Sequence, residues 1–190
     1  MSNARNLSNL LGSGTTIATA SIADDAITAA KIATDAVVAD GLSSSAIAAT
    51  DLPSGTILQA VTKTTTTVAT VTTASMTGFG LSQSFTPKSA SSTILIFLAV
   101  AGEHYSHSDL GIRIELRKDS SQVRNWAYLD YHSVDNSQNI SIQHLQYQES
   151  ASNTNARTYD VRAQPSNGSG TARVNNYNSP SMMTIMEIEG

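Results

Sequence analysis

Aliphatic side chains recur at every fifth position over the first third of the chain. Nine consecutive positions follow this spacing: Ile17, Ile22, Ile27, Ile32, Val37, Leu42, Ile47, Leu52 and Ile57. The residues between them are mostly Ala, Thr, Ser and Asp. The segment is therefore an internal repeat, and a repeat of this kind cannot bury its apolar row by itself.

A spacing of five residues fits neither a regular helix nor a regular strand. On an α-helix it advances each aliphatic by about 140° beyond a full turn, so no stripe forms. On a strand it sends successive aliphatics to opposite faces. Three interpretations remain: a β-solenoid, an extended shaft of several intertwined chains, and a disordered linker. The segment is long enough for only about two solenoid coils, fewer than the roughly three repeats needed for stability.

The regularity of the repeat favours the intertwined shaft over the linker. We expect it to span residues 15–54, with the aliphatics from Ile17 to Leu52 facing the shared axis. Residues 1–14 form a separate piece, in which Leu7, Leu10 and Leu11 share one face of a short helical turn. We interpret this piece as a docking peptide, with a frayed terminus as the alternative.

After Pro53-Ser54-Gly55 the pattern changes to short strands separated by Gly, Ser and Asn clusters. Residues 110–117 alternate apolar and polar, which predicts a strand with one buried face. Residues 93–101 are apolar on both faces, which predicts a central strand covered on each side, with a neighbouring subunit as one possible cover. The expected strands are 56–61, 65–73, 81–86, 93–101, 110–117, 122–131, 140–148, 157–164, 171–174 and 181–189. We therefore predict an all-β fold, an antiparallel sandwich or jelly roll over residues 55–190.

Composition narrows the function classes. The chain has 190 residues, a formal net charge of −4 and no cysteine. No basic patch stands out, so nucleic acid is not an expected partner. The longest apolar run, residues 94–101, is too short to cross a bilayer, and no secretory signal opens the chain, so we expect a soluble protein.

Five segments resemble bacteriophage proteins. Asp25-Ala-Ile-Thr-Ala-Ala-Lys-Ile and Asp35-Ala-Val resemble the repeats of phage tail-fibre and other virion structural proteins, and residues 4–12 resemble a short segment of such proteins from marine phages. Residues 84–96 and 184–188 are similar to parts of phage fibre head domains. The resemblance implies a homotrimer on the tail or capsid surface of a virion, with an N-terminal anchor on other virion proteins, a shaft and a C-terminal β head.

The densest aromatic stretch runs from Trp126 to His132 and is the candidate receptor contact. On a regular strand, one face would carry Trp126, Tyr128, Asp130 and His132, and the other would carry Ala127, Leu129 and Tyr131. Aromatic rings beside polar groups are typical of sugar-binding surfaces and of protein interfaces. The alternative is that one face belongs to the core or to a subunit interface. Tyr105 is a further candidate contact.

The sequence gives little indication of a metal site or of catalysis. His104 and His107 are expected on a loop with Asp109, but their spacing matches no metal signature, so we predict neither a metal nor another cofactor. The loops expected to contact a ligand are the Asn-, Ser- and Gly-rich segments 133–139, 150–157 and 165–178. No catalytic motif is present, and pairing Asp130 with Glu187 or Glu189 for glycan cleavage would be unspecific. We expect no enzymatic activity.

The repeat and the resemblance together predict a short trimeric phage fibre whose head attaches to a host-surface glycan. A capsid decoration or tail adaptor protein without receptor binding is the alternative. A glycan depolymerase is the least favoured of the three.

Overall fold

The computed structural model describes residues 47–72, 75–105, 110–133, 139–167 and 170–190. Residues 47–190 form one compact unit. The predictions for the docking peptide (Leu7, Leu10 and Leu11) and for the shaft positions from Ile17 to Leu42 lie outside the described residues.

The described part of the chain holds ten strands and no α-helix. The strands are β1 (Ile57–Thr65), β2 (Ala69–Val71), β3 (Thr77–Phe85), β4 (Thr93–Tyr105), β5 (Leu110–Lys118), β6 (Ser121–His132), β7 (Asn139–Ser150), β8 (Arg157–Pro165), β9 (Thr171–Val174) and β10 (Ser181–Ile188). Two short 3-10 turns are also present, η4 (Ala49–Asp51) and η5 (Asn176–Asn178). Each expected strand is confirmed, and the bounds of β9 are those predicted.

Residues 47–54, the end of the predicted shaft, differ from the extended structure that the sequence predicts. This segment is not extended throughout, because Ala49–Asp51 form η4, and the Ala48 amide donates to the Asp51 carboxylate at 2.8 Å. Within this segment Ile47 is exposed and Leu52 is half-buried.

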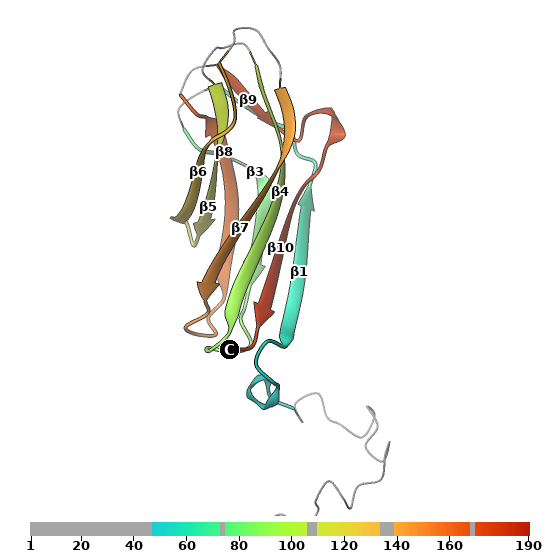
Figure 1. The fold of residues 1–190 in the computed structure, drawn as a ribbon, viewed down its shortest axis with the longest axis vertical. Coiled ribbons are helices and arrows are strands. Elements are labelled where there is room, and N and C mark those ends of the chain that lie inside the picture. The colour runs from blue at the N-terminus through green and yellow to red at the C-terminus, as the bar shows by residue number, and fades with distance from the viewer. Residues whose placement is uncertain (1–46, 73–74, 106–109, 134–138, 168–169) are drawn as a thin grey trace, which may run out of the picture. The chain divides into compact units, whose positions relative to one another are not determined.

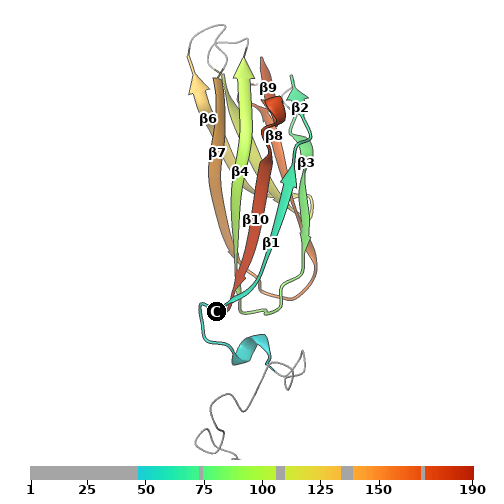
Figure 2. The same cartoon turned by 90° about the vertical axis from the view of Figure 1, so that its right-hand side faces the viewer.

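The strands form two antiparallel sheets stacked as a sandwich (Figures 1 and 2). In the larger sheet, β4 pairs with β7 on one side and with β10 on the other, and β10 pairs with β1. Farther along β4, β9 takes the place of β10 and is followed by β2. The smaller sheet has the order β3-β8-β5-β6. The orders β1-β10-β4-β7 and β3-β8-β5-β6 are those of a jelly roll.

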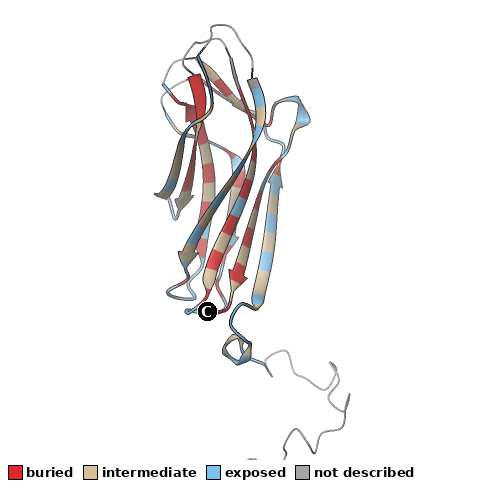
Figure 3. Ribbon diagram, viewed as in Figure 1, coloured by how far each residue is buried: buried red, intermediate tan, exposed pale blue. Residues whose placement is uncertain are grey.

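The core lies between the sheets. The predicted alternation of β5 is confirmed, since Leu110, Ile112, Ile114 and Leu116 are fully buried. On β4, the even positions from Ile94 to Val100 are buried, whereas Phe97 on the opposite face is 43% exposed (Figure 3). Within the described residues of one chain, the outer face of β4 is therefore open, and its cover by a neighbouring subunit stays a prediction.

The sandwich has two distinct ends. At the base, the Gly55 amide donates to the Glu189 carbonyl and the Glu189 amide donates to the Thr56 carbonyl, both at 2.9 Å, so the chain enters beside its own last strand. At the opposite end, the tip, β4, β6 and β8 end and β5, β7 and β9 begin (Figure 1). The segment 150–157 connects β7 to β8 at the base, so the three Asn-, Ser- and Gly-rich loops do not form one surface. Antiparallel order alone separates them, because successive connections alternate between the two ends.

Candidate functional site

The edge strand β6 carries two bulges within its predicted aromatic stretch. Its register against β5 pairs Trp126 with Ile114, Leu129 with Ile112 and His132 with Leu110. Between these pairs, two residues of β6 stand opposite one residue of β5, which is the count of a β-bulge. Each bulge resets the alternation of side chains between the two faces.

The bulges overturn the predicted division of faces. Trp126 and Leu129, which were expected on opposite faces, both pack against the core, because each stands opposite a buried isoleucine of β5. Trp126 is half-buried, and the Arg124 guanidinium carbon lies 5.9 Å from the centroid of its ring. Trp126 therefore contributes to the edge of the core rather than to an open aromatic platform.

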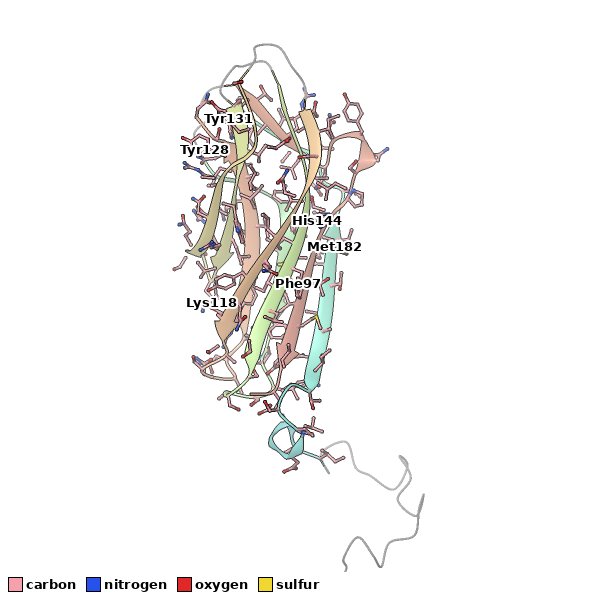
Figure 4. All side chains as sticks on the ribbon, viewed as in Figure 1. Phe97, Lys118, Tyr128, Tyr131, His144 and Met182 are labelled. Carbon is pink, nitrogen blue, oxygen red and sulfur yellow. The ribbon has the colours of Figure 1, made fainter. Side chains whose placement is uncertain are left out.

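Two tyrosines form the exposed aromatic surface instead. Tyr128 and Tyr131 are 55% and 50% exposed, and their rings meet edge to face with centroids 6.1 Å apart (Figure 4). The sequence analysis assigned Tyr131 to the face opposite Tyr128 and so missed it as a site residue. Tyr128 and Asp130 have φ angles of 57° and 53°. This left-handed conformation costs a non-glycine residue about 1–2 kcal/mol, so the surrounding structure must hold it in place.

Gly111 of β5 supports this part of β6. A Cβ atom at position 111 would lie 2.7 Å from the Leu129 carbonyl oxygen and 3.3 Å from the Tyr128 Cα. The Gly111 amide donates to the Ser166 Oγ at 2.8 Å, and the Ser166 amide donates to the Gly111 carbonyl at 2.9 Å. An isolated glycine within a strand pattern often marks a bulge or a close backbone approach, so Gly111 is a sequence signal from which the bulges could have been inferred.

Gly111→Ala is expected to lower the free energy of unfolding by about 2 kcal/mol, because the new methyl group has no room against the bulged backbone. Urea denaturation measures the loss. Trp126 is the only tryptophan in the chain and lies on the same strand, so its fluorescence should shift as well. The matched control is Gly78→Ala, since a Cβ there meets nothing within 4 Å. An equal effect of the two substitutions would contradict the supporting role of Gly111.

The other predicted site residues are dispersed. Asp130 lies on the second bulge and is half-buried. His132 is the last residue of β6, and Tyr105 is the last residue of β4. His104 was expected on a loop, but β4 continues through it, since it pairs with Asn139 and Ala172. His107 lies outside the described residues.

No cluster of three or more His, Cys, Asp or Glu side chains that could hold a metal ion occurs among the described residues. Likewise, the described part of the chain has no helix long and apolar enough to span a membrane. Asp130 is not brought together with Glu187, because Asp130 lies on β6 of the smaller sheet near the tip and Glu187 lies on β10 near the base. The carboxylate pair considered for glycan cleavage is therefore not assembled.

Comparisons with known proteins add little to this picture. No protein-family model and no curated protein matches the sequence. Among solved structures, this chain aligns with a viral protein chain from the structure named "Structure of infectious bursal disease virus Gt strain". The sequence identity is 16% and the TM-score is 0.25. The alignment covers 65% of this chain and spans 38% of the viral chain. At that TM-score the likeness carries no argument about fold or function.

Proposed function

We propose that this chain is the subunit of a short trimeric fibre of a bacteriophage virion, and that its jelly-roll head attaches to a host-surface glycan through Tyr128 and Tyr131. The observation that carries the proposal is the exposed tyrosine pair, two rings in contact on an edge strand whose bulges hold them in position. Tyrosine combines an apolar ring with a polar hydroxyl. Two such rings set at 70° suit a sugar, which has apolar C–H faces and a rim of hydroxyls.

The positions of the chain entry and of the tyrosine pair on the head support the same proposal. The chain enters the sandwich at the base, directly after the five-residue repeat, whereas the tyrosine pair lies on the half of β6 that leads to the tip. A fibre needs this arrangement, because the end joined to the shaft and the contact surface must not coincide. The resemblance of the repeat and of residues 84–96 and 184–188 to phage fibre proteins gives the proposal its biological setting.

Tyr128→Ala and Tyr131→Ala are each expected to weaken binding of the full chain to host-surface glycan about tenfold, the loss typical of an aromatic anchor at an interface. Binding of the full chain to purified host glycan, measured by surface plasmon resonance, tests this. Tyr177→Ala is the matched control, because Tyr177 is 67% exposed but lies on η5, away from β6.

Three results would count against glycan attachment by this pair. Equal losses in all three variants would remove the tyrosine pair as the site. Incorporation into particles without glycan binding would favour a decoration or adaptor protein. Release of reducing sugar would favour a depolymerase.

A further inference from the structure

The outer face of the larger sheet carries no charged side chain over three complete rows. The strand register sets twelve residues side by side across β7, β4, β10 and β1. We call them the neutral face: His144, Ala99, Met182 and Thr64; Gln146, Phe97, Thr184 and Thr62; Gln148, Leu95, Met186 and Ala60. Figure 4 shows Phe97, His144 and Met182 together on this sheet.

The outer face of the smaller sheet is different. There Glu115 and Arg117 form an ion pair, and so do Asp160 and Arg162, with Arg162 Nε 2.7 Å from an Asp160 carboxylate oxygen. The chain has 26 charged residues, 11 basic and 15 acidic, so a solvated sheet face is expected to carry several of them. The smaller sheet meets this expectation and the neutral face does not.

The neutral face also exposes large apolar side chains. Phe97 and Met182 are each 43% exposed, and a groove of about 390 Å³ beside Phe97 is lined by Leu95, Gln146, Tyr147 and Gln148. Farther along β7, Ile140 and Ile142 are 54% and 57% exposed. Depletion of charge together with Met and Phe is the composition found at the centre of protein interfaces.

We infer that the neutral face binds the head of another copy of this chain. A neutral surface is compatible with its own copy, because no like charges meet, and it offers nothing to a strongly charged partner. The connectivity also favours a copy. β1, the edge strand of this sheet, directly follows the repeat, so copies joined through their repeats would present this sheet to one another at high effective concentration. The inference thus deepens the proposed function, since it rests on the proposed association of copies and names the surface that the heads share.

The test uses the full chain, which has no native cysteine to interfere. Gln146→Cys introduces one thiol on the neutral face, and Thr158→Cys introduces a matched exposed thiol on the smaller sheet. In the native protein, maleimide should label Cys at 146 at least about tenfold more slowly than Cys at 158, because a group in a dry interface reacts only when the interface opens. In urea the two rates should be equal. Adding Phe97→Glu should raise labelling at 146 to the rate of the control, because it places an unpaired charge in the contact.

Solution mass from light scattering on the same samples shows whether another copy of the chain or another part of the same chain covers the neutral face. A multimer with slow labelling that Phe97→Glu restores supports the inference. A multimer whose two thiols react equally overturns it and leaves association through the repeat intact. A monomer with a protected thiol overturns it as well, since the cover would then be another part of the same chain. A monomer with equal labelling overturns both this inference and the trimeric part of the proposed function.

Discussion

Glu187→Ala is expected to lower the free energy of unfolding by about 4 kcal/mol, because each buried donor left without its acceptor costs about 1–3 kcal/mol. Glu187 is fully buried on β10. Its Oε1 accepts from the Lys88 amide at 2.9 Å, the Ser89 amide at 3.0 Å and the Ser92 hydroxyl at 2.7 Å, and its Oε2 accepts from the Gln59 side-chain amide at 2.6 Å. This carboxylate thus connects the β3–β4 connection to the last strand and to β1. Urea denaturation of the full chain measures the loss.

Glu187→Gln separates hydrogen bonding from charge. The amide keeps the shape and one acceptor oxygen, so we expect a smaller loss of about 2 kcal/mol. If glutamine costs as much as alanine, the charge rather than the number of acceptors decides the stability. If alanine costs less than about 1 kcal/mol, the role assigned to Glu187 is wrong.

The same pair of variants tests a pH dependence. Burial of Glu187 opposes its charge, but the hydrogen bonds from Lys88, Ser92 and Ser89 outweigh it and hold the pKa of Glu187 below its ordinary value. A depressed folded pKa contributes stability above the unfolded pKa of about 4.3, and that stability is lost as the pH falls through the folded pKa. The wild-type chain should therefore lose stability more steeply than Glu187→Gln between about pH 5 and pH 3. Parallel curves would contradict the assignment.

Glu149→Ala is expected to cost about 3 kcal/mol, because it removes the acceptor shared by both sheets at the base of the sandwich. Glu149 lies on β7 of the larger sheet. The Tyr159 hydroxyl of β8 donates to it at 2.5 Å, the Lys118 ammonium of β5 donates at 2.6 Å, and the Tyr147 hydroxyl donates at 3.2 Å. The Arg157 guanidinium completes the cluster at 3.6 Å. Thermal unfolding of the full chain measures the loss.

Tyr147→Phe is the matched control for Glu149→Ala. It removes only the longest of the three hydrogen bonds and should cost about 0.5–1 kcal/mol. Burial of Glu149 opposes its charge, yet the hydrogen bonds from Lys118 and Tyr159 keep its pKa below the ordinary value. Burial and the adjacent Glu149 raise the pKa of Tyr159. If Glu149→Ala cost no more than Tyr147→Phe, Glu149 would not be the link between the sheets.

The strands were predictable because their signal is local. A half-buried strand needs apolar side chains at every second position, and residues 110–117 show that pattern directly. The ends of β9 were predicted correctly, since it is bounded by Gly170 and Asn175, residues that commonly interrupt strands.

The polar positions that hold the base together were not predictable. Glu187 and its partners at Lys88 and Gln59 are about 100 and 128 residues apart in sequence, so no local pattern connects them.

The candidate site was predictable only in part. The sequence located the aromatic stretch on β6, but it placed Tyr128 with Trp126 because strict alternation was assumed. The two bulges in this stretch bring the β6 backbone close to Gly111 of the adjacent strand, where a Cβ atom would lie 2.7 Å from the Leu129 carbonyl oxygen, and that is a contact between strands.

The sequence by itself determined the all-β class, the number and approximate bounds of the strands, and a central strand that is apolar on both faces. These follow from the spacing of side chains along one strand, which each residue and its neighbours decide. Only the tertiary structure decided which tyrosines meet, which loops share an end of the sandwich and which face of β4 stays open. Those features depend on register and on the stacking of two sheets, and both arise from contacts between residues far apart in the chain.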